Sequence, residues 1–388
     1  MDRIYLDHTA TTPLAPRVLE AMLPFLAGEF GNASSAHWFG RKAKDALEGA
    51  RERVARAIGA KPSELFFTSG GTEANNLAIL GTLRAARKKR MVHVVTDAAE
   101  HHAVLDACEH VRDDGFSVTV LDVNSDGRLA PESVEQALQP GTALVSVMHA
   151  NNEVGTIQPI KEISLLTGGR GALLHTDAVQ SIGKIPVHVE DLGVQLLTIS
   201  AHKIYGPKGI GALYIRQGTA WDPVFHGGGQ ERGKRPGTEN VASAVGFATA
   251  VELVLEERET EMRRLQLLRD TLQRELHAAF PRMLVNGHSE CRLPHLLSIS
   301  FDAGAMPMEG EMLVTNMDLE GVAVSSGSAC TSGSVQPSHV LLAMGRDAGT
   351  AKATLRFSFG RGNTPEELPI VVDAVRRIAE HMVKATRN

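Results

Sequence analysis

The sequence predicts an α/β protein with a smaller α+β part, and three observations support this prediction. Short apolar runs of strand length alternate with helical patterns between about residues 50 and 215. A long segment without glycine or proline follows at 247–280. Beyond it, two runs alternate between apolar and polar residues, as half-buried strands do. Strands separated by helical spacers imply parallel crossovers, and therefore a sheet covered on both faces.

Six apolar runs are expected to form the strands of the main sheet, at residues 64–68, 91–95, 117–121, 143–148, 171–175 and 196–200. In sheets of this kind, ligands bind outside the carboxyl ends of the strands. Residues directly after a run are therefore candidates for a functional site, whereas residues within a run belong to the core. The segment 206–211 (GPKGIG) superficially resembles a nucleotide-binding loop, but its place between two strands favours a hairpin turn.

The rest of the chain predicts a connecting helix and a second, smaller unit. Residues 247–280 are expected to form one helix or two nearly continuous ones, up to ~50 Å long. The alternating runs at 297–301 and 355–359 predict strands, and 364–367 (TPEE) is typical of a capping box that opens a final amphipathic helix. We expect a large domain over residues 14–258 and a small domain built from residues 1–13 and 259–388.

Composition excludes several classes of protein. The 388 residues suit two domains, and 43% apolar with 22% charged residues is ordinary for a globular protein. The net charge of -5 is negative, so the protein as a whole does not attract nucleic acid or anionic lipid electrostatically. Three cysteines without a CxxC pair argue against a disulfide framework and a zinc site. With no apolar leader and no membrane-length run, we expect a cytoplasmic protein that binds neither membrane nor nucleic acid directly.

The segment 68–73 (TSGGTE) follows an apolar run and precedes a helical pattern. Its two glycines allow a tight turn, and the free N–H groups of a helix N-terminus attract an anion, with Thr72 as an added donor. A phosphate group would fit there. Many strand-to-helix turns look similar, so a plain capped helix remains the alternative.

Two neighbouring runs bring five polar side chains to the same rim of the expected sheet: Asp177, Gln180, Ser200, His202 and Lys203. A carboxylate that faces a heteroaromatic nitrogen keeps it protonated, and a nearby lysine supplies a Schiff base. Asp177 and Lys203 suit these two roles toward a pyridoxal cofactor. The alternatives, a helix-capping Asp177 and a solvated Lys203, do not explain why both follow strand ends.

Arg356 and His101 are further candidates. The planar guanidinium of Arg356 matches a carboxylate in two-pronged geometry, so it could hold an amino acid by the end that all amino acids share. Its alternative is a surface arginine at a strand edge. The imidazole of His101 suits acid–base chemistry near neutral pH. Its alternative is a solvated histidine pair with His102, in a chain with 16 histidines.

Cys330 lies in a stretch of small polar residues, 325–334 (SSGSACTSGS), which favours a mobile loop. A lone cysteine is more often a small buried hydrophobe than a nucleophile. Here the neighbouring residues are small and polar, so they would not form an apolar environment that buries the thiol. A thiolate on such a loop could attack a sulfur atom and then move outward. Cys108, in a helical stretch, and Cys291, in a polar loop, are expected to have no catalytic role.

Motifs along nearly the whole chain resemble those of the cysteine desulfurases, in the NifS/IscS-like branch of the class V aminotransferases. They lie at 6–13 (LDHTATTP), 68–73 (TSGGTE), 100–104 (EHHAV), 151–155 (NNEVG), 175–180 (HTDAVQ), 200–203 (SAHK), 235–240 (RPGTEN), 325–330 (SSGSAC) and 355–358 (LRFS). The resemblance implies the fold type I architecture of pyridoxal 5'-phosphate enzymes, with a mainly parallel seven-stranded sheet and a smaller α+β domain. It also implies a homodimer with composite sites.

The resemblance further implies a role for each site residue. Lys203 would carry the cofactor, Asp177 would pair with the pyridinium nitrogen, Gln180 would bond the ring oxygen, and His101 would stack on the ring. The phosphate would be held by Gly71, Thr72, Ser200 and His202, and by Thr238 from the second subunit.

By the same resemblance, Asn152, which borders the cofactor, and Arg356 would receive the carboxylate of L-cysteine. The implied reaction releases L-alanine and leaves the sulfur on Cys330 as a persulfide, with Lys203 and His101 as the other catalytic residues. An acceptor protein such as an iron–sulfur scaffold would then take the sulfur. No resident metal is expected, although Cys330 could contact an iron–sulfur cluster transiently.

Several questions stay open at this level. Ala33 replaces the proline usual in the family, and the chain ends at residue 388 without the aromatic, proline-containing tail of some relatives. The acceptor could therefore belong to iron–sulfur assembly, tRNA thiolation or a general sulfur relay. A transaminase or selenocysteine lyase on the same scaffold, and a catalytically silent scaffold, are the alternative functions. A histidine–metal hydrolase lacks support, since there is no HExxH motif.

Overall fold

The computed structural model describes residues 3–304, 310–327 and 336–385. Its central element is a seven-stranded sheet with the order β2-β8-β7-β6-β5-β3-β4. The strands are β2 (Leu65–Thr68), β3 (His93–Asp97), β4 (Ser117–Leu121), β5 (Thr142–Ser146), β6 (Leu173–Asp177), β7 (Leu196–Ser200) and β8 (Gly211–Ile215). Only β8 runs antiparallel to its neighbours, so the sheet is mainly parallel, as predicted.

The six predicted apolar runs all coincide with strands, with ends displaced by at most two residues. The segment 206–211 connects the antiparallel strands β7 and β8, which confirms its interpretation as a turn. The 3-10 helices are η1 (Pro62–Glu64), η2 (Ala201–Lys203) and η3 (Gln230–Gly233).

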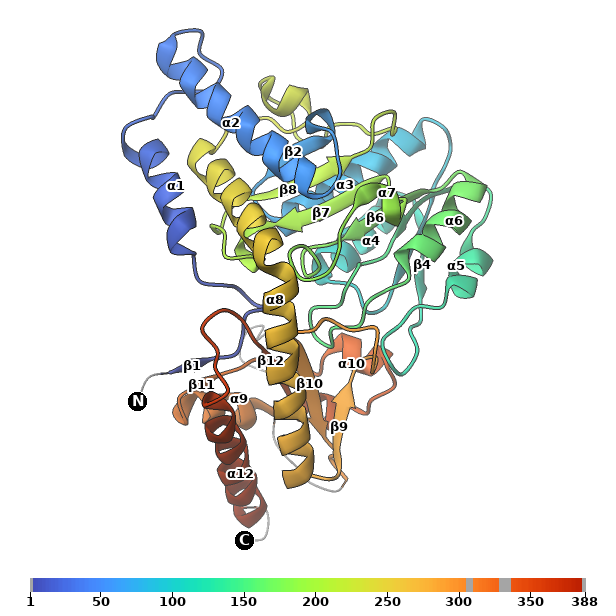
Figure 1. Ribbon diagram of the computed structural model, residues 1–388. Coiled ribbons are helices and arrows are strands. Elements are labelled where there is room, and N and C mark those ends of the chain that lie inside the picture. The colour runs from blue at the N-terminus through green and yellow to red at the C-terminus, as the bar shows by residue number, and fades with distance from the viewer. Residues whose placement is uncertain (1–2, 305–309, 328–335, 386–388) are drawn as a thin grey trace.

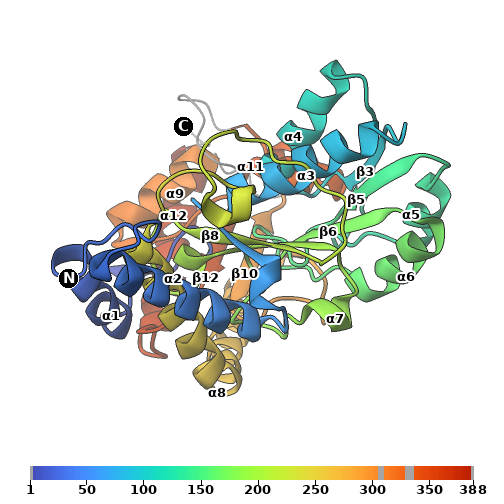
Figure 2. The same cartoon turned by 90° about the horizontal axis from the view of Figure 1, so that it is seen from above.

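Helices cover both faces of the sheet (Figure 2). One side carries α3 (Gly71–Arg87) and α4 (His102–Asp113), and the other carries α2 (Trp38–Ala57), α6 (Ile160–Arg170) and α7 (Val189–Leu192). Helix α2 shows why: its buried residues Ala43, Leu47, Ala50 and Val54 recur every three or four positions and form one apolar stripe. Helix α5 (Pro131–Ala137) packs beside α6.

Helix α8 (Val241–Ala279) is a single helix of 39 residues that runs from the large sheet into the lower part of the molecule (Figure 1). Its first half packs against α1 (Pro16–Ala27) and α2, and Val251 and Val254 join the core beneath the sheet. Its second half contributes Leu265 and Leu272 to a separate hydrophobic core. The helix therefore connects two cores, as the glycine-free segment predicted.

The lower part contains a three-stranded antiparallel sheet of β9 (Met283–Asn286), β10 (Leu296–Phe301) and β12 (Thr354–Ser358). Beside it, β1 (Ile4–Tyr5) pairs with β11 (Val322–Ala323). The helices here are α9 (Gly310–Leu319), α10 (His339–Ala343), α11 (Ala348–Lys352) and α12 (Glu367–Ala385). Ile4 and Leu6 share the core of this part with residues 265–379. The exact domain boundaries stay a prediction.

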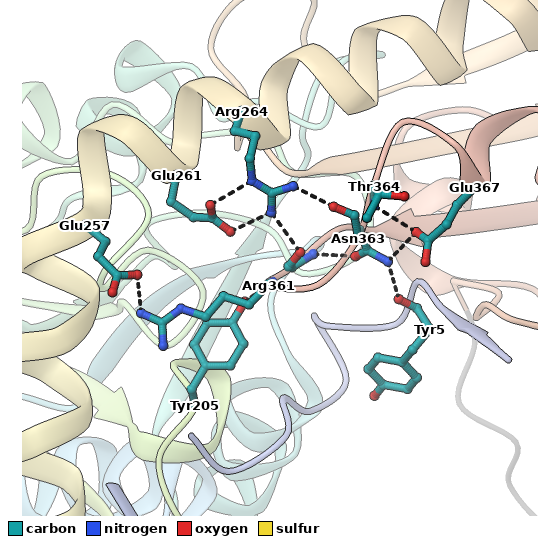
Figure 3. Close-up of polar contacts among 10 residues, drawn as sticks. Tyr5, Tyr205, Glu257, Glu261, Arg264, Arg361, Asn363, Thr364 and Glu367 are labelled. Atoms are coloured by element: carbon teal, nitrogen blue, oxygen red, sulfur yellow. Dashed lines mark hydrogen bonds and ion pairs between the residues drawn. The ribbon is translucent and has the colours of Figure 1, made fainter. Parts of the chain in front are cut away.

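A polar network ties the middle of α8 to the segment between β12 and α12 (Figure 3). Arg264 binds Glu261 and donates to the carbonyl oxygen of Asn363 at 2.5 Å. The backbone N–H of Arg361 donates to the hydroxyl of Tyr205 at 2.9 Å, and the Arg361 guanidinium lies over that ring. Because Tyr205 follows Lys203 by two residues, the network holds the lysine's loop against the lower part of the molecule.

The predicted capping box at the start of α12 is formed in part, because the Glu367 carboxylate accepts from the backbone N–H of Thr364 at 3.2 Å. Among the described residues, no helix combines the length and apolar character needed to cross a membrane.

Candidate active site

A cavity of about 320 Å³ opens at the carboxyl ends of β6 and β7. Its lining contains every predicted cofactor and substrate residue that the structure describes except Thr238: Gly71, Thr72, His101, Asn152, Asp177, Gln180, Ser200, His202, Lys203 and Arg356. Residues up to 285 positions apart in sequence, Gly71 and Arg356, thus meet in one place. For five of these residues, the rule that ligands bind at the carboxyl ends of parallel strands predicted that they would meet: Asp177, Gln180, Ser200, His202 and Lys203.

Asp177 ends strand β6 and is held by two donors. Asn75 Nδ2 donates to its Oδ2 at 2.6 Å, and the backbone N–H of Val179 donates to its Oδ1 at 2.9 Å. Asn75 projects from α3 and is fully buried. Sequence analysis missed Asn75, because an asparagine in a helical pattern gives no signal of a partner about 100 residues away.

Lys203 closes the short helix η2 directly after β7. Its Nζ donates to the carbonyl oxygens of Thr9 and Ala10, both at 2.6 Å. Burial, and then the nearby Arg356 guanidinium, lower the pKa of Lys203 to about 8. The neutral amine, the form that attacks a carbonyl, is therefore far more abundant near physiological pH than for an ordinary lysine.

A cradle for an anion lies where β2 leads into α3. Gly71 begins the helix, and a Cβ there would lie 2.9 Å from Val179 Cγ2, so a side chain would crowd the cradle. Ser200 Oγ faces the same cavity; it is buried and has no hydrogen-bond partner among the described residues. Free N–H groups and an unpartnered hydroxyl suit a phosphate. The cradle thus favours the anion site over the plain capped helix.

His101 caps helix α4, because its Nδ1 accepts from the backbone N–H of Ala103 at 3.0 Å. The ring is accessible from the cavity, while the surrounding protein lowers the pKa of His101 by desolvation. The expected alternative, a solvated pair with His102, does not describe this position: His102 instead lies against His339, with ring centroids 4.6 Å apart.

Arg356 lies in β12 and is buried, which excludes the surface alternative. Its Nη1 donates to the carbonyl oxygen of Asn152 at 3.0 Å, and its Nη2 donates to Asp7 Oδ1 at 2.9 Å. Its Nε has no hydrogen-bond partner in the described part of the chain. Asp7 comes from the first motif of the sequence, but its role as the partner that aims Arg356 could not be foreseen.

Thr238 is not brought to the cavity within one chain. It is exposed, and it lines a second cavity together with Arg235 and Glu231. The loop before it is held by a buried ion pair, in which Arg51 Nη1 lies 2.6 Å from Glu231 Oε2. Its predicted contribution to the site of a second subunit stays a prediction.

Cys330 lies outside the described residues, between Gly327 and Gln336. Of the other cysteines, Cys108 is buried in α4, and burial raises the pKa of its thiol to about 12. Cys291 is half-buried in a loop, 3.4 Å from Arg128 Nη1. Across the residues that the structure describes, no group of three or more His, Cys, Asp or Glu is placed to hold a metal ion.

Comparison with known proteins decides the family. The model of the class V aminotransferases matches residues 4–371. The chain is 49% identical to cysteine desulfurase IscS of Dictyoglomus turgidum, with 98% of this chain and 95% of that protein covered. It belongs to the class V aminotransferase family, in the cysteine desulfurase branch. This class V aminotransferase is also 47% identical to putative cysteine desulfurase IscS 1 of Bacillus subtilis, over 97% of the chain and 100% of the relative.

A solved structure of a NifS-like protein agrees with this class V aminotransferase at a TM-score of 0.90 and 39% identity, covering 98% of this chain and 99% of that one. The predicted fold is therefore confirmed. The family depends on pyridoxal 5'-phosphate. The residues of the cavity fit this cofactor: it offers a carboxylate, a lysine of lowered pKa, an anion cradle, and two buried oxygens without partners, Ser200 Oγ and Gln180 Oε1.

Proposed function

We propose that the chain is a cysteine desulfurase that converts L-cysteine to L-alanine and takes the sulfur on Cys330 as a persulfide. The observation that carries this proposal is the convergence of Asp177, Lys203 and Arg356 in one cavity. Such a cavity offers groups suited to a cofactor and to an amino acid. Relatives that match the whole chain and are named cysteine desulfurases support the choice of substrate.

The cofactor would be held by residues of the cavity. Asp177 would face its pyridinium nitrogen, Gln180 its ring oxygen and His101 its ring, while Lys203 would bind it covalently. The phosphate would rest on four residues of the cradle and its rim: Gly71, Thr72, Ser200 and His202. When bound, pyridoxal 5'-phosphate withdraws electrons from the α-carbon of the substrate, which labilises the α-proton and prepares the sulfur for attack.

The chain's own residues would do the rest. Arg356 and Asn152 receive the substrate carboxylate, and Asp7 keeps the guanidinium aimed into the cavity. The amine of Lys203, with a pKa of about 8, can accept the α-proton and return a proton later. His101 is the second proton carrier, because its ring is accessible from the cavity.

Sulfur transfer balances without an external oxidant. The Cys330 thiolate attacks the sulfur of the substrate, so an S–S bond forms and the Cβ–S bond breaks. The electron pair of the broken bond stays on carbon, which takes up a proton and becomes the methyl group of alanine. The substrate carbon is thus reduced and the Cys330 sulfur oxidised. A thiol of the acceptor then removes the outer sulfur by exchange.

The assembly and its partners belong to the same proposal. Large apolar side chains are exposed on α1, on the segment after it and at the start of α2, including Leu26, Phe30 and Trp38 at 60%, 72% and 56% exposure. A homodimer would cover such a surface and would bring Thr238 to the other subunit's cavity. The acceptor would serve iron–sulfur cluster assembly or other sulfur trafficking. Free Cys108 and Cys291 suit a reducing compartment, so we place the protein in the cytoplasm.

The test is release of sulfide and alanine from L-cysteine in the presence of dithiothreitol. The wild type should be yellow and should release both products in equal amounts. Lys203→Ala should lose the cofactor absorbance band, and Cys330→Ala should keep that band but release almost no sulfide. Alanine formation that requires a keto acid would indicate a transaminase, and full activity of Cys330→Ala would exclude the persulfide route.

A further inference from the structure

A buried carboxylate, Glu153, lies between Gly327 and Ser338, two described residues on either side of segment 328–335. It follows Asn152, whose carbonyl oxygen binds Arg356, and only 6% of its surface is exposed. Its backbone N–H donates to Asn151 Oδ1 at 2.8 Å, which fixes the main chain at this point. The mechanism described above makes no use of Glu153, although burying a carboxylate carries a cost in free energy.

On one side, Glu153 binds Ser338, which lies three residues beyond the end of segment 328–335. Ser338 Oγ donates to Glu153 Oε2. Ser338 Oγ also accepts from the backbone N–H of Leu341 at 3.2 Å, so Ser338 caps helix α10. The next residue, His339, reaches the carbonyl oxygen of Glu100 at 2.8 Å, beside the cavity residue His101. The chain after the segment is therefore anchored to the wall of the site.

On the other side, Glu153 touches the residue that precedes the segment. A Cβ on Gly327 would lie 2.5 Å from Glu153 Oε2 and 3.1 Å from Ser338 Cβ, so Gly327 packs directly against this hydrogen-bonded pair. Two residues earlier, Ser325 exchanges backbone hydrogen bonds of 2.7 and 3.3 Å with Arg356. Gly327 and Ser338, on either side of the segment, thus meet at one carboxylate. Ser325 links the first side to the arginine expected to bind the substrate.

We propose that Glu153 is a positioning residue that holds Gly327 and Ser338 together, and thereby sets where the segment with Cys330 starts and ends relative to Arg356. The proposal rests on the function proposed above and adds a residue to it. A nucleophile must be held within a fraction of an ångström to react well, and small displacements cost about 100-fold in rate. Loss of Glu153 should therefore lower the rate of sulfur transfer more than the rates of the earlier steps on the substrate.

The experiment separates these two stages in the holoenzyme. Stopped-flow absorbance follows the change in the cofactor spectrum when L-cysteine is added, which needs Lys203 and Arg356. Rapid quenching with mass spectrometry follows the gain of one sulfur atom on Cys330 in a single turnover without reductant. Glu153→Ala should slow sulfur gain by about tenfold or more, while the absorbance change keeps its rate within about threefold.

One variant controls for folding, and a second tests the contact between Glu153 and Ser338. In Glu153→Gln the amide oxygen can still accept from Ser338, so sulfur gain should stay within about threefold of the wild type. Ser338→Ala should slow sulfur gain, and its effect should not add to that of Glu153→Ala, because both remove the same contact. Equal slowing of both stages, or additive effects in the double variant, would overturn the positioning role.

The outcomes also separate this inference from the proposed function. Sulfur gain on Cys330 in the wild type, with the same rate in Glu153→Ala, would overturn only the positioning role. No sulfur gain in the wild type would overturn the proposed function itself.

Discussion

Asn75 donates a hydrogen bond of 2.6 Å to Asp177 deep in the cavity, and so orients the carboxylate expected to face the cofactor ring. Replacing Asn75 by alanine removes this donor from Asp177 Oδ2 and leaves the carboxylate held only by the backbone N–H of Val179 among the contacts described above. We expect cofactor affinity to fall by about tenfold, because a charged hydrogen bond is worth about 1.5 kcal/mol or more. Titration of the apoenzyme with pyridoxal 5'-phosphate, followed by absorbance, measures this change.

Asn76→Ala is the matched control, because Asn76 lies in the same helix and its Nδ2 donates to the backbone carbonyl of Thr72 at 2.9 Å, not to Asp177. Its affinity should match that of the wild type. An equal loss in both variants would mean that helix α3, rather than the contact to Asp177, determines cofactor binding.

Arg356→Lys should raise the KM for L-cysteine by about tenfold to 100-fold and leave the cofactor spectrum unchanged. A lysine is a single point charge and cannot present two parallel N–H donors to a carboxylate. It also cannot keep the Asn152 and Asp7 contacts together, which are 3.0 and 2.9 Å long in the wild type. Initial rates over a range of cysteine concentrations test this prediction, and an unaltered KM would contradict it.

The pKa of Lys203 predicts how cofactor attachment depends on pH. Because only the neutral amine attacks the aldehyde, the rate should rise with pH and level off above a midpoint of about 8, rather than near the usual 10.5. Arg356 lowers this pKa and Asp7 raises it. Removing the cation in Arg356→Met should therefore move the midpoint upward, and removing the anion in Asp7→Asn should move it downward. Shifts with the opposite signs would refute this account.

His175 makes the stability depend on pH. It lies in β6 between Ser146 Oγ at 2.8 Å and Thr198 Oγ1 at 3.1 Å, and burial lowers the pKa of His175 to about 3 from 6.5. The unfolded chain therefore binds a proton below pH 6.5 that the folded chain does not bind. The free energy of unfolding should fall as the pH drops from about 6.5 toward 3, by up to about 1.4 kcal/mol per pH unit for this group.

The variant His175→Asn removes this titration. It should be less stable at pH 7 because both hydrogen bonds change, but its stability should depend less steeply on pH between 6.5 and 4. Denaturant unfolding at several pH values gives both quantities. Parallel pH curves for the two proteins would show that His175 does not contribute to the slope.

Much of the fold could be predicted because its signals are local. The strands of the large sheet are short runs rich in apolar residues between turn residues, and α8 contains neither glycine nor proline from Phe247 onward. The strand ends then placed Asp177 and Lys203 at one edge, since parallel strands share their carboxyl ends. By contrast, the pairing of β1 with β11 joins residues more than 300 positions apart, and two short strands leave no pattern to predict it.

The candidate site divides in the same way. Residues whose chemistry is visible in their type, such as Lys203 and Arg356, could be predicted. Residues that orient them could not, because Asn75, Asp7 and Glu153 act through partners that only the folded chain brings near. Cys330 could be selected from its small polar neighbours, but its position in the fold lies outside the described residues.

The transfer of sulfur from L-cysteine to Cys330 can be observed in a single turnover without reductant or acceptor. The purified holoenzyme is mixed with excess L-cysteine. The alanine formed per active site is quantified, and the mass of the Cys330 peptide is measured by mass spectrometry. We expect the reaction to stop after one alanine per site, with one sulfur atom added to Cys330, and to resume when dithiothreitol is supplied. Continued alanine release with an unmodified Cys330 would contradict this expectation.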